Sequence, residues 1–223
     1  MTDSKKHWQD LEKDVGGEPV TLGRYMSHTY ANDPKRIAFV AARYKFAAKM
    51  LDGCKTAIEV GCGDGFGAPI VADAVGALIG TDINEDMLAD IRGRLSFVEN
   101  ASFEYVDFRE GPYSKPVNAI YLIDVIEHIA PKEEAGFMEN LAASLEDHGV
   151  LLIGTPNKTA DQYASEWSKK GHINLKTHET LKKLGEAYFQ TVFMFGMNDE
   201  VIHTGFPAMS HFLWALCVTP KGC

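Results

Sequence analysis

The stretch AIEVGCGDGFGAPIVA, residues 57–72, decides the fold. A short apolar run passes an acid, Glu59, and glycines then fall at positions 61, 63 and 65 before an apolar pattern of helical spacing. Glycine adopts positive φ without strain and lets a ligand lie against the backbone. A strand, a glycine loop and a helix in this order are typical of the first unit of an open α/β sheet, where ligands bind beyond the carboxyl ends of the strands. The stretch therefore predicts both a fold class and a ligand site.

Downstream of Thr56, short apolar runs alternate with patterns of helical spacing. Such alternation predicts a parallel sheet with helices on both faces. The last two apolar runs, QTVFMFGMN and HFLWALCVTP, have only a loop between them and predict a closing antiparallel hairpin. We therefore expect an α/β fold with a doubly wound, mostly parallel, Rossmann-like sheet of seven strands, the last of them antiparallel. The connection from Asn157 to Thr177 is unusually long and is expected to shape the ligand site.

Residues 1–52 precede the sheet and are expected to form a helical lid, while residues 53–223 form the ligand-binding domain. Apolar residues recur at helical spacing through DPKRIAFVAARYKFAAKMLDG, where Asp33 is the expected N-cap. The preceding segment LGRYMSHTY, residues 22–30, is expected to belong to the part of the lid that closes over the ligand and excludes water.

The charge balance limits the partners of the protein. Asp and Glu outnumber Lys and Arg by 31 to 22, which gives a formal charge of -9. This charge repels a phosphate backbone and disfavours nucleic acid as a partner. The N-terminal stretch is polar, unlike a signal peptide, and no apolar run approaches the length of a membrane span. We therefore expect a cytoplasmic protein, monomeric or homodimeric, that acts on a small molecule and has no membrane partner.

Acids at three expected strand ends indicate the ligand. Glu59 precedes a G-x-G-x-G loop, which differs from the G-x-G-x-x-G dinucleotide fingerprint, and an acid at this point suits a cationic amine better than a pyrophosphate. Asp82 follows about 20 residues after the loop, where a carboxylate can accept both hydrogen bonds of a ribose diol. Asp107 ends the third expected strand and suits the exocyclic amine of an adenine. Together they describe a ligand with an amine, a ribose and an adenine.

At these motifs the sequence resembles the class I S-adenosylmethionine-dependent methyltransferases, over about residues 36–220. The matching segments are AIEVGCGDGFG, LIGTDIN, EYVDF, YLIDVIEHI and GVLLIGTPN, in the order that the family has them. The resemblance implies S-adenosyl-L-methionine as cofactor, with S-adenosyl-L-homocysteine as product. It further implies a set of residues that bind the methionine part, the ribose and the adenine: Glu59, Gly61, Cys62, Gly63, Asp82, Ile83, Asp107, Phe108, Ile123 and Asp124.

The stretch DVIEHI, residues 124–129, is the candidate for the chemistry. Asp124, Glu127 and His128 lie adjacent or one helical turn apart, so all three can face the mouth of the cleft. His128 can accept a proton from a hydroxyl or an amine near neutral pH. We take His128, Glu127 and, in the long connection, His172 as candidate catalytic residues. The alternative for His128 and Glu127 is simple hydrogen bonding at the start of a helix.

The same stretch is similar to that of the ubiquinone-biosynthesis O-methyltransferases and their relatives, which include small-RNA 3′-end methyltransferases. In some of these enzymes a comparable cluster of acids and histidine holds a divalent metal against the acceptor hydroxyls. The resemblance therefore makes a metal possible, held by Asp124, Glu127, His128 and His172. Ile129 stands where the RNA enzymes have a second histidine. We accordingly assign no metal.

The sequence thus predicts a methyltransferase that acts on a hydroxyl or amine of a small molecule, such as a sugar, a precursor of a surface polysaccharide or a phenol. One alternative is an inactive S-adenosylmethionine-binding module that serves as a sensor or partner subunit. Another is a metal-assisted O-methyltransferase acting on a diol or an RNA end. A nicotinamide dehydrogenase is the third, and the glycine spacing disfavours it.

Overall fold

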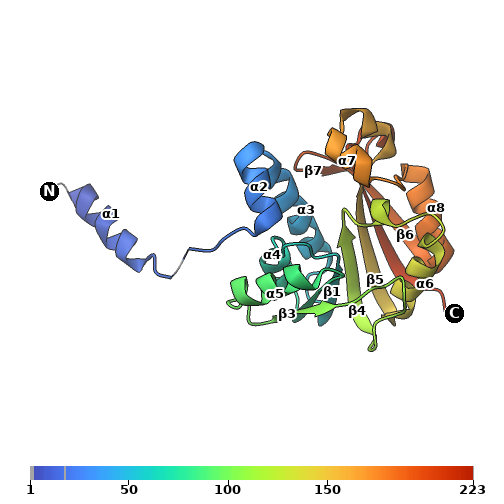
Figure 1. Ribbon diagram of the computed structural model, residues 1–223, viewed down its shortest axis with the longest axis horizontal. Coiled ribbons are helices and arrows are strands. Elements are labelled where there is room, and N and C mark those ends of the chain that lie inside the picture. The colour runs from blue at the N-terminus through green and yellow to red at the C-terminus, as the bar shows by residue number, and fades with distance from the viewer. Residues whose placement is uncertain (1–2, 18, 223) are drawn as a thin grey trace.

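The computed structural model describes residues 3–17 and 19–222, apart from the side chain of Trp167. Within these residues the chain forms one eight-stranded sheet of order β3-β2-β1-β4-β5-β8-β6-β7 (Figure 1). Five strands run parallel: β1 (Thr56–Val60), β2 (Ala77–Asp82), β3 (Ala101–Tyr105), β4 (Val117–Ile123) and β5 (Leu145–Pro156). The antiparallel partner of β5 is β8 (Phe212–Pro220), which also pairs antiparallel with β6 (Phe189–Asn198). The predicted parallel sheet, antiparallel last strand and closing hairpin are confirmed.

The expected count of seven strands was one too low. A short strand, β7 (Val201–His203), turns back at Asp199 and pairs antiparallel with the end of β6. Asp199 adopts a positive φ of 49°, as tight hairpin turns require. Three residues at the edge of a sheet carry too little hydrophobic alternation to be recognised as a strand.

Helices cover both faces of the sheet, as predicted. One face packs against α3 (Arg36–Met50), α4 (Ala68–Ala72) and α5 (Glu85–Arg94). The other packs against α6 (Glu134–Ala143) and α8 (His178–Tyr188). Neighbouring strand residues serve opposite cores, since Tyr121 belongs to the first and Ile120 to the second. The central strands are therefore continuous apolar runs, which is the pattern of a parallel sheet buried on both sides.

Two further helices precede α3. The helix α2 (Arg24–Asn32) packs on α3 and buries Met26, whereas α1 (Asp3–Asp14) buries none of its residues and extends away from the sheet (Figure 1). The prediction that Asp33 caps α3 was wrong. The N-cap is Lys35, because Asp33 ends α2 and its carbonyl accepts the backbone amide of Arg36 in an intervening turn.

The long connection after β5 carries two short helices of its own, η2 (Lys158–Tyr163) and α7 (Glu166–Gly171). Thr177 then caps α8 through a capping box with Thr180. A single turn, η1 (Ile126–His128), follows β4, and η3 (Pro207–Met209) precedes β8.

Across the described residues 3–17 and 19–222, no helix is both long enough and apolar enough to cross a membrane.

Candidate active site

The glycine loop after β1 requires its glycines. Gly61, Gly63 and Gly65 all have positive φ, between 56° and 71°. A Cβ on Gly61 would lie 2.6 Å from a methyl group of Val125. The backbone amide of Gly63 donates to Oδ2 of Asp82 at 3.0 Å, so the loop lies directly over the end of β2. The structure therefore brings the glycine loop next to Asp82, and the role of both in binding a ligand stays a prediction.

Asp82 is partly exposed at the end of β2, and each of its carboxylate oxygens accepts one backbone amide. The amide of Asn84 donates to Oδ1 at 2.9 Å, and that of Gly63 donates to Oδ2. A carboxylate oxygen has lone pairs for further donors, such as ribose hydroxyls. Ile83 is 54% exposed beside it, which leaves its side chain free to flank a ring.

Glu59 is only 1% exposed on the β1 strand. The Tyr121 hydroxyl donates to its Oε2 at 2.9 Å. Burial raises the pKa of Glu59 to about 7, against the opposing effect of hydrogen bonds from Tyr121 and Tyr44. Sequence reasoning missed both tyrosines, because each stands in an ordinary apolar pattern. Cys62 is also buried, and burial raises the pKa of its thiol, which does not favour a nucleophile.

Asp107 follows β3 and is held by Arg109. The guanidinium donates to both carboxylate oxygens, at 2.8 Å from Nε and 2.5 Å from Nη2. Hydrogen bonds from Arg109 lower the pKa of Asp107. An adenine amine would therefore share this carboxylate with Arg109. Phe108 and Ile123, the remaining predicted cofactor residues here, are buried.

The helix α2, which is predicted to belong to a lid, contacts the glycine loop through Asp64. The backbone amide of Met26 donates to Oδ2 of this buried acid at 2.8 Å. The Arg94 guanidinium donates to the Asp64 carbonyl at 2.5 Å. The sequence offered no signal for this contact beyond the acid inside the loop.

Asp124 directly follows β4 in a strained conformation, with φ of 57°. Its Oδ2 accepts Nη1 of Arg43 from α3 at 2.6 Å. The same guanidinium lies 3.9 Å from the ring centroid of Phe212, which in turn packs 5.4 Å from the Trp214 ring. Sequence reasoning missed Arg43, because a basic residue on a surface helix is ordinary.

The three candidate catalytic residues meet at one point. Glu127, His128 and His172 offer ligand atoms that all lie within 4.8 Å of one another. Nδ1 of His128 lies 2.8 Å from the carbonyl oxygen of Gly171. Because a carbonyl only accepts, that nitrogen carries the proton, and Nε2 of a neutral His128 is left as an acceptor.

Two buried atoms of this cluster have no hydrogen-bond partner within the described residues: Oε1 of Glu127 and Nδ1 of His172. The other oxygen of Glu127 accepts the Thr155 hydroxyl at 3.0 Å. Burial and the charge of Asp124 raise the pKa of Glu127 to about 8. Burial and the neighbouring His128 lower the pKa of His172. Unpartnered buried atoms are uncommon and point to a proton or cation that they receive in function.

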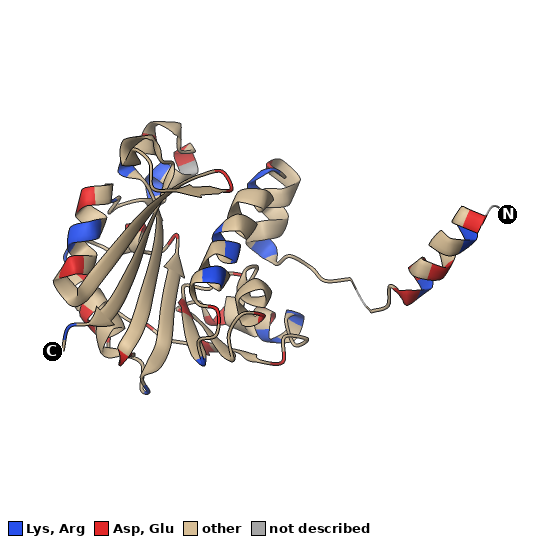
Figure 2. Ribbon diagram, turned by 180° about the vertical axis from the view of Figure 1, so that it is seen from behind, with Lys and Arg blue, Asp and Glu red and all other residues tan. Residues whose placement is uncertain are grey.

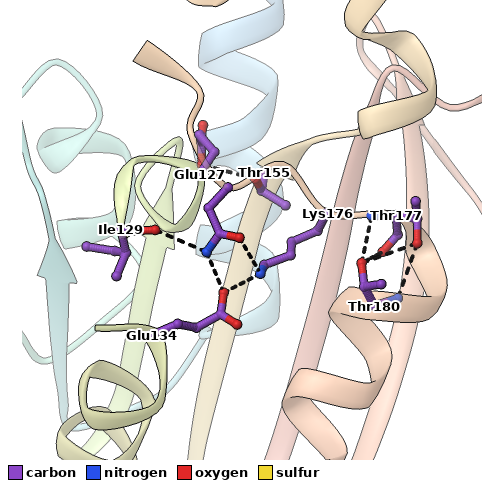
Figure 3. A network of polar contacts seen from close by, with 8 residues as sticks. Glu127, Ile129, Glu134, Thr155, Lys176, Thr177 and Thr180 are labelled. Atoms are coloured by element: carbon purple, nitrogen blue, oxygen red, sulfur yellow. Dashed lines mark hydrogen bonds and ion pairs between the residues drawn. The ribbon is translucent and has the colours of Figure 1, made fainter. Parts of the chain in front are cut away.

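A polar network holds the His172 segment against the η1 turn (Figure 3). The backbone amides of Ile173 and Asn174 both donate to the Glu127 carbonyl at 3.0 Å. The Asn174 side chain donates to the Ile129 carbonyl at 3.0 Å and to Glu134 at 2.7 Å. Lys176 forms an ion pair with Glu134 and donates to Asn174 Oδ1 at 2.9 Å. The network therefore positions His172 beside His128.

A cavity of about 420 Å³ opens at this cluster. A second cavity of about 230 Å³ adjoins it and shares Arg36 and His172. The residues of the larger cavity that carry charge or titrate are Arg36, Arg43, Asp124, His128, Lys170 and His172.

The order β3-β2-β1-β4-β5-β8-β6 places a glycine loop and three acids at one sheet edge, which defines a cofactor-binding α/β domain with an adjoining cavity. Residues 30–188 match the family described as methyltransferase domain, so the chain belongs to that family. The fold and the family are those of the class I S-adenosylmethionine-dependent methyltransferases, which supports S-adenosylmethionine as the cofactor. The family match disfavours the nicotinamide alternative.

Individual proteins agree with this assignment. A probable S-adenosylmethionine-dependent methyltransferase of Mycolicibacterium smegmatis is 32% identical over 107 residues. That match covers 45% of this chain and 38% of the relative, so the chain spans well under half of the relative's length.

Solved structures share the fold. The methyltransferase domain of bacterial CtHen1 has a TM-score of 0.69 at 16% identity, covering 82% of this chain and all of that one. The N-methyltransferase NodS of Bradyrhizobium japonicum, in complex with S-adenosyl-L-homocysteine, has a TM-score of 0.64 at 14% identity and covers 96% of this chain and 98% of its own.

Proposed function

We propose that this protein transfers the methyl group of S-adenosylmethionine to a hydroxyl or amine of a small molecule bound in the 420 Å³ cavity. A sugar, a precursor of a surface polysaccharide or a phenol is of suitable size. One observation carries the proposal: Asp124 and His128 line the same cavity. Asp124 belongs to the predicted cofactor set and His128 is the predicted base, so the cavity joins the methyl donor to the proton acceptor.

Methyl transfer from a sulfonium is an in-line displacement. The acceptor oxygen or nitrogen forms a bond to the methyl carbon, the carbon–sulfur bond breaks, and the cofactor loses its positive charge. The protein has to align the acceptor with the methyl group and remove one proton. Nε2 of His128 takes that proton, since its Nδ1 is committed to the Gly171 carbonyl. A lowered pKa keeps His172 uncharged beside it.

The test begins with calorimetric titration of S-adenosylmethionine and S-adenosylhomocysteine, with NAD as the control ligand. Both adenosyl compounds are expected to bind. Asp82→Ala is expected to lower their affinity by at least roughly tenfold, because hydrogen bonds to a charged group are lost. Asp86→Ala, an exposed acid in the next turn, is the matched control and should bind normally. A folded protein that binds neither adenosyl compound would contradict the proposal.

The second stage measures transfer of labelled methyl groups to a panel of sugars, phenols and amines. His128→Gln is expected to lower kcat by roughly 10²–10⁴ while leaving cofactor affinity unchanged. His148→Gln, an exposed histidine far along the chain, should have full activity. A wild-type protein that binds cofactor yet methylates nothing in the panel favours the inactive binding module.

A metal-assisted form of the reaction is a second candidate, favoured by the unpartnered Glu127 Oε1 and His172 Nδ1. Glu127, His128 and His172 are the residues that would hold a divalent ion. Such an ion would polarise an acceptor hydroxyl and lower its pKa. Loss of activity on chelation with EDTA, restored by Mn²⁺ or Mg²⁺, would support this form, and full activity in EDTA would exclude it.

A further inference from the structure

The charge of the 420 Å³ cavity is opposite to that of the whole protein. The chain carries a formal charge of -9. The cavity, however, is lined by three cationic side chains, Arg36, Arg43 and Lys170, and by one carboxylate, Asp124. A local surplus of positive charge in an acidic protein is a feature of ligand recognition rather than of bulk composition.

Ion pairing leaves two of these cations uncompensated. Arg43 pairs with Asp124 at 2.6 Å. Across the described chain, neither Arg36 nor Lys170 lies within ion-pair distance of an acid. The adjacent Lys169 differs, since it is paired with Glu166 at 3.1 Å. The positive charge at the cavity that has no ion-pair partner in the described chain therefore belongs to Arg36 and Lys170.

The two cations come from different elements that meet at His172. Arg36 is the first residue of α3, and Lys170 lies in the last turn of α7; Figure 2 shows basic segments on both helices. Arg36 lines both cavities. His172 also lines both cavities, so Arg36 lies along the same walls as the candidate catalytic cluster. The larger cavity thus has its free positive charge next to its candidate base.

We propose that Arg36 and Lys170 form an anion subsite that binds a carboxylate or phosphate group of the methyl acceptor. The inference rests on the proposed function, in which this cavity holds the acceptor. A guanidinium binds two oxygens of a carboxylate or phosphate with parallel hydrogen bonds, and an ammonium adds a mobile point charge. An anchored anion would fix the acceptor so that its hydroxyl or amine faces His128. The net charge of -9 favours a small anionic molecule over a nucleic acid.

The test uses protein saturated with S-adenosylhomocysteine and calorimetric titration of four probes: phenyl phosphate, benzoate, benzyl alcohol and a short RNA oligonucleotide. At least one small anion is expected to bind roughly tenfold more tightly than benzyl alcohol, because a charge-assisted hydrogen bond is gained. Its affinity should fall as salt is added, since both cations are exposed to solvent. The preference between phenyl phosphate and benzoate identifies the kind of anion.

Arg36→Gln and Lys170→Gln are each expected to weaken the anion by roughly tenfold and to leave benzyl alcohol unchanged. Lys49→Gln on α3 and Lys169→Gln on α7 are the matched controls and should bind the anion normally. The inference is overturned if benzyl alcohol binds as tightly as the small anions, or if neither substitution changes the affinity for the anion. So does tight binding of the RNA alone.

The readouts separate this inference from the function on which it rests. Failure of S-adenosylhomocysteine to bind contradicts the proposed function before any anion is added. If an anionic acceptor is methylated at the same rate by wild type and by Arg36→Gln, the proposed function holds and the anion subsite is wrong.

Discussion

The carboxylate of Asp64, in the glycine loop, accepts a hydrogen bond of 2.8 Å from the backbone amide of Met26, in the first turn of α2. A negative charge at the N-terminus of a helix is stabilised by the helix dipole and by the free amides there. The helix that is predicted to act as a lid is therefore joined to the loop that is predicted to hold the cofactor. Movement of either one changes the contact.

Asp64→Ala is expected to loosen α2, since the charged hydrogen bond to Met26 is lost. We expect S-adenosylhomocysteine to bind several-fold more weakly, which corresponds to about 1 kcal/mol. Limited proteolysis should also cut the segment 19–35 faster than in wild type. The exposed acid Asp73 supplies the control substitution Asp73→Ala. Unchanged affinity together with unchanged proteolysis would show that the contact does not hold the lid.

A pH dependence of stability follows from Glu59. Its pKa is raised from 4.5 to about 7 in the folded protein, chiefly by burial. Below pH 4.5 Glu59 is protonated in both the folded and the unfolded chain, so the free energy of unfolding does not change with pH through this group. Between pH 4.5 and about 7 the unfolded chain releases the proton that the folded chain keeps, and stability falls by roughly 1.4 kcal/mol per pH unit.

Glu59→Gln removes that proton exchange. Chemical denaturation of both proteins at about pH 5 and about pH 7 should show wild type losing stability relative to the variant as pH rises. All other titrating groups cancel in the comparison. If the difference in the free energy of unfolding between the two proteins is the same at both pH values, Glu59 is ionised over this whole range. The hydrogen bonds from the tyrosines would then offset the effect of burial on its pKa.

The metal-assisted form of the reaction predicts that Mn²⁺ binds to the Glu127, His128 and His172 cluster and raises the Tm. At a hundredfold excess over the Kd, a ligand specific for the folded state adds about 2.7 kcal/mol, or roughly 5–10 °C for a chain of this size. Glu127→Gln should abolish the shift, whereas Glu139→Gln, an exposed acid on α6, should retain it. An equal shift in both variants would place the metal elsewhere.

Lys176→Ala is expected to destabilise the protein by about 3 kcal/mol, because Glu134 is left partly buried without its partner. The Mn²⁺ shift should shrink as well, since Lys176 belongs to the network that positions His172. The exposed pair of Lys182 and Glu186 gives a control, for which Lys182→Ala should cost less than about 1 kcal/mol. The double substitution Lys176→Met with Glu134→Leu should regain stability without regaining the metal response.

The sheet could be predicted because burial on both faces makes each central strand a continuous apolar run between helical patterns. The glycine loop could be predicted because alternate glycines let a ligand lie against the backbone. Asp82 could be predicted because a carboxylate at the end of the second strand is typical of a ribose-binding residue. A catalytic role for His172 requires that it lie near His128, and the structure brings the two side chains together. The roles of both residues stay predictions.

Contacts across the chain could not be predicted in the same way. Arg43 and Asp124 are 81 residues apart, and Met26 and Asp64 are 38 residues apart. Arg43 and Met26 are unremarkable in their own segments, and only the packing of α2 and α3 brings them to their acidic partners. The strand β7 could not be predicted because its three residues have no strand pattern of their own, and it forms only by pairing with β6.

The Arg43 guanidinium lies over Phe212, and Phe212 packs on Trp214, whose indole is fully buried and donates to the sulfur of Met197 at 3.4 Å. A ligand that draws Arg43 away from Asp124 thereby alters the surroundings of an indole two contacts away. Tryptophan emission from the unlabelled protein then supplies an optical signal for arrival at the cavity. The chain has two other tryptophans, Trp8 on the exposed α1 and Trp167, and the double substitution Trp8→Phe with Trp167→Phe removes their background emission.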